Sequence, residues 1–175
     1  MGKQATAEVK FAKQTGGHGQ FAEVHLRIEP LPEAEFEFGN EVVGGNIPKN
    51  FIPAVEKGIN ETMQAGIMAG YPVVDFRVRL HFGGYHDVDS SEMAFKVAGS
   101  MAFKKAMEQC NPILLEPIMA LEVTVPDDCM GDVIGDLNSR RGKVVGVEPQ
   151  ANSQLIKAEV PMAEVLRYAP ELRSL

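Results

Sequence analysis

The sequence contains few cysteines, no tryptophan and no long apolar run. Cys110 and Cys129 are the only cysteines among 175 residues, and they are too few and too far apart for a disulfide framework or a Cys-x-x-Cys metal site. No apolar stretch approaches the roughly 20 residues that a membrane span requires, and the first residues do not resemble a signal peptide. We therefore expect a cytoplasmic protein that has no membrane partner.

An excess of basic residues is also missing. Against 17 Lys and Arg there are 24 Asp and Glu, which gives a net charge of −7 at pH 7 and a pI of about 5.1. The parts before and after Leu115 are both acidic. A broad basic face, which drives non-specific binding to nucleic acid, is therefore excluded. Any contact with RNA has to be made locally, by a few shaped loops.

Motifs for nucleotide binding and for catalysis are missing too. There is no Gly-x-x-x-x-Gly-Lys-Ser/Thr loop, and Gly16-Gly17-His18-Gly19 is no dinucleotide fingerprint because Ala22 stands where a third glycine would fall. The spacing of His81, His86, Asp87 and Asp89 matches no metal-binding motif, and no nucleophile elbow is present. The sequence therefore predicts no catalytic residue, no metal site and no cofactor in this chain.

The first part of the chain shows the periodicities of strands and of two helices. Alternation of apolar and polar residues predicts four strands, at 8–13, 22–28, 36–43 and 74–81. A glycine-rich turn joins the first two. Apolar residues at every fourth position predict a core-facing helix that ends at Gly66, and a second helix follows Asp89.

The loop before the second helix carries a histidine. We expect Asp89 to be the N-cap of this helix, with Glu92 three residues later closing a capping box. His86 would then be exposed at the tip of a rigid element. One apolar side of the helix is predicted to carry Ala94, Ala98, Met101 and Ala102.

A second unit follows the proline-bracketed junction at 112–117. Its pattern predicts strands and helices in the order β-α-β-β-α, at 119–125, 131–141, 144–148, 154–160 and from Pro161 to about Tyr168. This is a ferredoxin-like split βαβ unit without its last strand. We expect the fragment to end before that strand, and to self-associate through the unpaired edge of the strand at 119–125.

Arg140-Arg141-Gly142 stands where the first helix of this second unit ends. Cations complement a helix C-terminus, and glycine readily adopts the left-handed conformation of the cap. The guanidinium fork also suits phosphate. Capping is the first interpretation, and contact with RNA is left open as a second.

Several longer motifs resemble the C-terminal part of bacterial translation elongation factor G. They are Gly16–Ala22, Val43–Pro48, Ala69–Asp75, Gly84–Lys96 and Leu114–Met119. They follow one another in the family's order and with nearly the family's spacing. The similarity extends from about Val9 to the last residue.

This resemblance implies an α+β fold of two domains. Residues 1–115 would form the factor's fourth domain, a ribosomal-protein-like βαβ domain with a left-handed crossover, contrary to the usual right-handed rule. Residues 116–175 would form most of the fifth domain, a truncated ferredoxin-like split βαβ domain.

The resemblance also implies a function on the ribosome. The tip of the fourth domain would enter the aminoacyl site of the small subunit, in the decoding region, and promote translocation of transfer RNA and messenger RNA. The expected ribosome- and RNA-binding residues are Gly17, His18, Gly19, Gln20, Tyr85, His86 and Asp87. Arg140 and Arg141 would make a secondary contact with ribosomal RNA.

The parent protein would be a monomeric translational GTPase whose GTP and magnesium bind in domains absent from this chain, so that the fragment itself is not an enzyme. Two alternatives stay open at this point. The parent could be a paralogue specialised in ribosome recycling, or the chain could be a regulatory module that binds a small ligand or a protein, because fold alone allows it.

Overall fold

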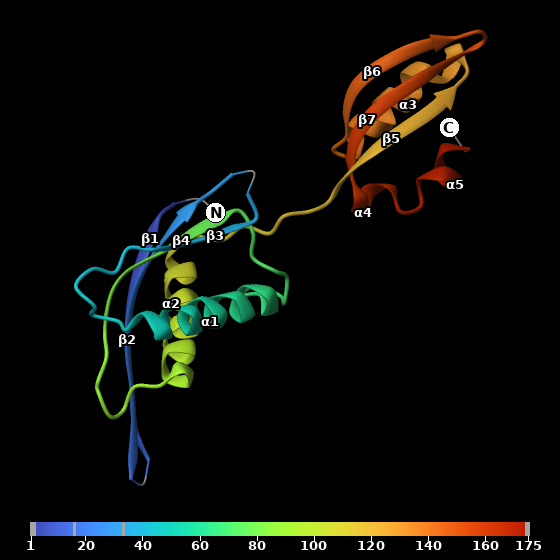
Figure 1. The fold of residues 1–175 in the computed structure, drawn as a ribbon. Helices are drawn as coiled ribbons and strands as arrows, with labels where there is room; N and C mark the ends of the chain where they lie inside the picture. Colours follow the sequence, from blue (N-terminus) through green and yellow to red (C-terminus); the bar gives the residue numbers. More distant parts are fainter. Residues whose placement is uncertain (1–2, 16, 33, 174–175) are drawn as a thin grey trace. The chain divides into compact units, whose positions relative to one another are not determined.

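The computed structural model describes residues 3–15, 17–32 and 34–173, without the side chains of Thr15 and His18. The chain divides into two compact units, Met1–Leu114 and Leu115–Leu175, which are described separately (Figure 1). Each unit combines helices with one sheet, so the predicted α+β class is confirmed. No helix within the described ranges is long and apolar enough to cross a membrane.

The first unit contains a four-stranded sheet in the order β1-β2-β4-β3. Its strands are β1 (Ala5–Thr15), β2 (His18–Pro30), β3 (Phe36–Asn40) and β4 (Phe76–Gly84). The β1–β2 and β2–β4 pairs are antiparallel, whereas β3 and β4 are parallel. A parallel pair requires a crossover, and here it runs through η1 (Lys49–Phe51) and α1 (Ile52–Ala65). The handedness of this crossover stays a prediction.

Apolar and polar residues alternate along the strands, so that one face of the sheet is apolar. This face packs in one core with α1 and α2 (Glu92–Gln109). In β4 the buried residues Phe76, Val78 and Leu80 alternate with half-buried polar ones, as predicted. The predicted apolar side of α2 is wrong at Met101, which is 44% exposed, while Ala94, Ala98 and Ala102 are buried.

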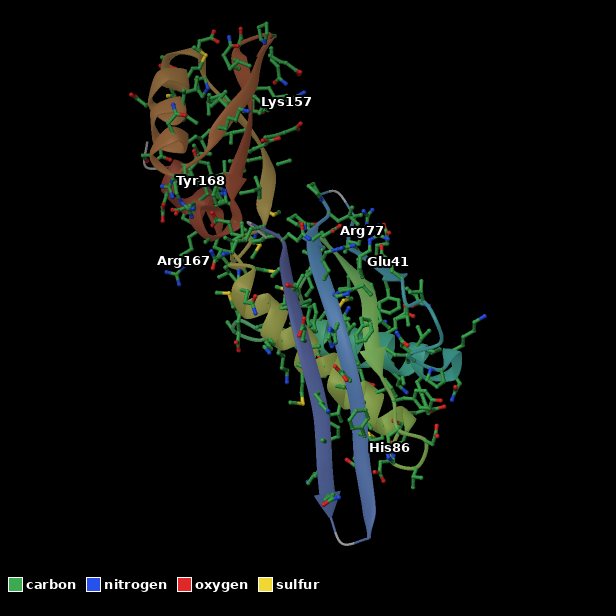
Figure 2. The ribbon with its side chains drawn as sticks, turned by 90° about the vertical axis from the view of Figure 1, so that its left-hand side faces the viewer. Glu41, Arg77, His86, Lys157, Arg167 and Tyr168 are labelled. Atoms are coloured by element: carbon green, nitrogen blue, oxygen red, sulfur yellow. The ribbon has the colours of Figure 1, made fainter. Side chains whose placement is uncertain are left out.

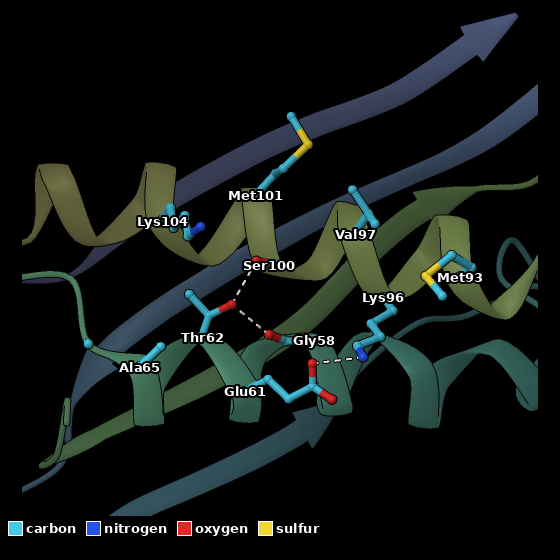
Figure 3. A pocket seen from close by; sticks show the side chains of 11 residues that line it. Gly58, Glu61, Thr62, Ala65, Met93, Lys96, Val97, Ser100, Met101 and Lys104 are labelled. Carbon is cyan, nitrogen blue, oxygen red and sulfur yellow. Dashed lines mark hydrogen bonds and ion pairs between the residues drawn. The ribbon is translucent and has the colours of Figure 1, made fainter. Parts of the chain in front are cut away.

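The two helices cross in close contact at two glycines. An alanine Cβ at Gly58 would lie 2.1 Å from the carbonyl oxygen of Lys96, and one at Gly99 would lie 2.8 Å from the carbonyl oxygen of Val55. The hydroxyl of Thr62 donates a hydrogen bond of 2.7 Å to the carbonyl of Gly58 beside the crossing (Figure 3). Backbone therefore packs directly against backbone, and neither position has room for a side chain.

A β-bulge changes the facing of β4 near its end. The strand carries one extra residue, His81, between the partners of Leu26 and His25 on β2. Beyond the bulge, Phe82 is exposed and Gly83 is buried. A Cβ at Gly83 would lie 2.3 Å from a carbonyl oxygen of β2. Bulges re-aim a strand in this way, and here the re-aimed segment leads into the loop that carries His86.

The second unit contains a three-stranded antiparallel sheet in the order β5-β7-β6. Its elements are β5 (Ile118–Val125), η2 (Asp127–Cys129), α3 (Met130–Ser139), β6 (Lys143–Gln150), β7 (Ser153–Pro161), α4 (Met162–Val165) and α5 (Tyr168–Leu172). Within the described part of the chain, β5 pairs with β7 alone. The single helix predicted from Pro161 to about Tyr168 is wrong: Arg167, at φ −125°, separates two short helices.

Candidate functional site

The loop between β4 and α2 is fastened to β2 through Ser90. Its hydroxyl donates a hydrogen bond to the carbonyl of Phe21 and accepts one from the amide of His86, both 2.8 Å long. The amide of Ser90 donates to the carbonyl of His86 at 3.0 Å, and the amide of Phe21 donates to the carbonyl of Asp89 at 2.8 Å. β4 pairs with β2 only from Glu23 onward. Where β4 no longer reaches β2, at Phe21, the loop therefore forms the backbone hydrogen bonds with β2 in its place.

Gly19 allows the hairpin of β1 and β2 to approach this loop. A Cβ at Gly19 would lie 2.5 to 2.7 Å from the carboxylate atoms of Asp89, so the end of the Asp89 side chain would have to move aside. Gly17 is exposed and has a φ of +117°, a value that glycine adopts without strain. The two glycines thus serve different needs, close packing at Gly19 and the turn itself at Gly17.

The ring of His86 is held on its inner side and exposed on its outer side. Its Nδ1 accepts hydrogen bonds of 3.3 Å from the amides of both Val88 and Asp89. The Oδ2 atom of Asp89 lies 3.4 Å from Nδ1, and the ring of Phe21 lies 6.3 Å away between centroids. The side chain is 56% exposed and lies at the loop beside β2 (Figure 2). The expected exposure of His86 is therefore confirmed.

The other predicted residues lie near this junction in different surroundings. Gln20 is half-buried on β2, and Tyr85 and Asp87 are exposed on the loop. The side chain of His18 lies outside the described residues. Sequence reasoning missed Phe21 and Ser90, which join the two segments. No sequence signal marks Phe21, because it acts through its backbone.

The predicted N-cap of α2 is wrong. The N-cap is Ser91, whose hydroxyl accepts a hydrogen bond of 3.1 Å from the amide of Ala94. Asp89 lies two residues earlier, where its carbonyl binds Phe21 and its carboxylate faces Gly19. Contact with the hairpin therefore decides which of the two polar residues caps the helix.

This assignment predicts unequal effects of two substitutions. Ser91→Ala should destabilise the first unit by about 1 kcal/mol, because the amide of Ala94 loses its acceptor, while Asp89→Ala should leave the helix intact. Urea unfolding followed through NMR amide signals of α2 measures both. A larger loss in Asp89→Ala, with Ser91→Ala unchanged, would restore Asp89 as the cap.

Arg140 fastens the C-terminal helices of the second unit to α3. Its guanidinium donates to Asp136 at 2.8 and 3.3 Å, to the carbonyl of Glu164 at 3.1 Å and to Glu171 at 2.7 Å. It also lies 4.9 Å from the centre of the Tyr168 ring. The hydrogen bonds with Asp136 and Glu171 raise the pKa of Arg140. Arg140 is therefore a structural anchor.

Arg141, and not Gly142, takes the left-handed position after α3, at φ +59°. The predicted glycine cap is thus displaced by one residue. The amide of Gly142 donates to the carbonyl of Leu137 at 2.9 Å, and a Cβ there would lie 2.6 Å from that oxygen. The guanidinium of Arg141 binds Glu116 at 2.6 Å and Glu164 at 3.0 Å, and the first bond lowers the pKa of Glu116. An RNA contact through either arginine stays a prediction.

A groove of about 540 Å³ between α1 and α2 is a further candidate site. Methionine side chains line it together with polar groups that bind each other, such as Lys96 and Glu61 at 2.7 Å (Figure 3). Lys96 and Glu61 therefore neutralise each other across the groove. Among the residues that the structure describes, no group of three His, Cys, Asp or Glu could hold a metal ion.

The chain matches known proteins along its whole length. The family description "Elongation factor G, domain IV" matches residues 1–111, and "Elongation factor G C-terminus" matches residues 113–175. Elongation factor G of Aquifex pyrophilus is 59% identical over 174 residues, which are 99% of this chain and 25% of that protein. A crystal structure of a protein from Thermus thermophilus is similar with a TM-score of 0.87 at 46% identity, covering 99% of this chain and 26% of that chain.

The chain thus spans about a quarter of the length of the relatives it matches. Both relatives cover both units, and the two family descriptions divide the chain near the junction between them. The chain therefore belongs to the elongation factor G family and comprises its domain IV and its C-terminal domain.

Proposed function

We propose that this chain is the part of a ribosomal translocase that enters the aminoacyl site of the small subunit and promotes movement of transfer RNA and messenger RNA. The observation that carries the proposal is the junction at Ser90, which joins the glycine-rich hairpin and the His86 loop into one braced end of the first unit. A rigid end of this kind suits a part that occupies a site by shape.

Local charge supports contact with RNA despite the net charge of −7. Between Glu8 and Glu23 the only Lys, Arg, Asp or Glu residues are Lys10 and Lys13. Both belong to β1, and the ammonium of Lys10 lies 5.2 Å from the centre of the Phe21 ring. The two lysines therefore offer cations to phosphates from β1, whereas Asp87 and Asp89 lie on the loop that packs against the hairpin.

In this proposal the chain binds and positions, and the chemistry belongs to the rest of the parent protein. The parent is a monomeric cytoplasmic GTPase that holds GTP and magnesium in its other domains. The partners of this chain are ribosomal RNA in the decoding region and the transfer RNA–messenger RNA complex. Family membership argues against the regulatory-module alternative, while a paralogue specialised in ribosome recycling would use the same end of the molecule.

The test separates movement from GTP hydrolysis in the full-length factor. His86→Ala should slow translocation by about tenfold, the effect of losing one hydrogen bond that contributes about 1.4 kcal/mol, and should leave ribosome-stimulated GTP hydrolysis nearly unchanged. Met101→Ala, an exposed position on α2, is the control and should alter neither rate. Equal losses of both rates in His86→Ala would contradict the proposed role.

A further inference from the structure

The two nitrogens of the His86 ring have different surroundings. Two backbone amides, those of Val88 and Asp89, point at Nδ1 from 3.3 Å. An amide N–H is only a donor, so Nδ1 has to offer its lone pair to both. A proton on Nδ1 would face two amide hydrogens. The loop backbone therefore fixes the proton of the neutral ring on Nε2.

An ion pair with Asp89 is the competing arrangement, with a protonated Nδ1 donating to the carboxylate. Nδ1 and Oδ2 of Asp89 lie 3.4 Å apart, but only the two amides meet the angular requirements of a hydrogen bond to Nδ1. Among the side chains that the structure describes, the ring that faces His86 from β2 is that of Phe21, which carries no charge. The geometry thus favours two amide donors over a carboxylate acceptor.

The outer nitrogen is left for a partner. Among the described residues, none forms a hydrogen bond with Nε2, and the side chain is 56% exposed. The loop cannot easily turn, because Ser90 holds both the amide and the carbonyl of His86. Nε2–H is therefore presented in a fixed direction.

We propose that His86 acts as a hydrogen-bond donor through Nε2–H and recognises an acceptor oxygen of RNA, with Ser90 as the residue that positions it. The ligand rests on the function proposed above, while the proton position rests on this chain alone. A phosphate, a ribose hydroxyl and a base carbonyl all offer such an oxygen. Messenger RNA with 2′-deoxynucleotides or with methylphosphonate linkages separates these sources, because the first removes the ribose hydroxyl, the second removes the anionic phosphate oxygen, and both keep the base carbonyls.

The proton position is measured on this chain by long-range ¹H–¹⁵N correlation of the histidine rings at about pH 8, where free histidine is neutral and exchanges between two tautomers. We expect Nδ1 of His86 to be entirely unprotonated. Asp89→Asn should keep this state, because the donors are backbone amides, whereas Ser90→Ala should restore an exchanging mixture. The ring of His81 serves as an internal reference. A proton on Nδ1 would overturn the inference. An unprotonated Nδ1 that Asp89→Asn changes and Ser90→Ala does not would also overturn it.

Two isosteric substitutions test the donor in the full-length factor. The glutamine amide nitrogen in His86→Gln lies close to the place of Nε2, and the asparagine amide nitrogen in His86→Asn lies close to that of Nδ1. His86→Gln should keep translocation within about threefold of the parent, and His86→Asn should lose about tenfold, as His86→Ala does. The reverse order would overturn the inference.

The two proposals fail in distinguishable ways. If the NMR spectra place the proton on Nε2 but His86→Ala translocates at the parent rate, the proposed function is wrong and the proton position stands. If His86→Ala slows translocation but Nδ1 carries the proton, the function stands and the inference drawn here is wrong.

Discussion

Gly58→Ala is expected to destabilise the first unit by about 3 kcal/mol, the upper part of the usual range for overpacked interiors. The new Cβ would lie 2.1 Å from the carbonyl oxygen of Lys96. Backbone of another helix cannot move aside as a flexible side chain does, so α1 and α2 have to separate along their whole contact. Alanine also favours the helix by about 1 kcal/mol over glycine, which only partly offsets the clash.

Two further glycines provide matched controls. Gly99→Ala should cost less, because its nearest backbone atom is 2.8 Å away, and Gly135→Ala in α3 should be neutral or slightly stabilising, because its Cβ would meet nothing within 4 Å. Chemical unfolding followed through NMR amide signals of each unit gives the three values. If Gly58→Ala were as stable as Gly135→Ala, the close crossing of α1 and α2 would be wrong.

Arg140→Ala is expected to destabilise the second unit by about 2 kcal/mol. The substitution removes charge-assisted bonds to Asp136 and Glu171, together with the bond to the Glu164 carbonyl. Such bonds contribute about 1.5 to 3 kcal/mol each when buried, and the sum is discounted because the Arg140 side chain is 20% exposed. α5 should therefore detach first.

Arg141→Ala is the matched control for this effect. Its side chain is 54% exposed and its partners Glu116 and Glu164 are exposed carboxylates, so water replaces the lost bonds and the change should be small. Hydrogen exchange of the Tyr168–Leu172 amides reports the detachment of α5, and urea unfolding of β7 reports the unit. Equal protection of these amides in both variants would show that Arg140 does not anchor α5.

The elements with a clear period could be predicted from the sequence, whereas their ends could not. Phe76, Val78 and Leu80 face the core as alternation requires. The strand predicted to reach Val43 ends at Asn40, whose side-chain oxygen accepts a hydrogen bond from the amide of Val42 and turns the chain away. The sequence pattern shows which side of a strand a residue faces. It does not show which polar group will accept the hydrogen bond of a given backbone amide, and that choice decides where the strand ends.

The candidate site shows the same division. His86 and the glycines could be predicted because loops rich in glycine and histidine stand out in the sequence. The cap at Ser91 and the junction through Ser90 could not, because Asp89, Ser90 and Ser91 are all competent caps and hydrogen-bond partners. Their roles are divided by contact with Phe21, a residue 68 or more positions earlier in the chain.

The junction at Ser90 has a mechanical consequence. The β1–β2 hairpin extends past the ends of the helices (Figures 1 and 2), and a two-stranded ribbon anchored only at the sheet would bend like a cantilever. The brace at Phe21 leaves three residue pairs beyond it, Gln20 with Lys13, Gly19 with Gln14 and His18 with Thr15, or about 10 Å of free length. The stiffness of a beam rises steeply as its free length shortens. A load applied at the end of the hairpin is therefore passed through Ser90 into the sheet, and little of it is lost in bending the ribbon.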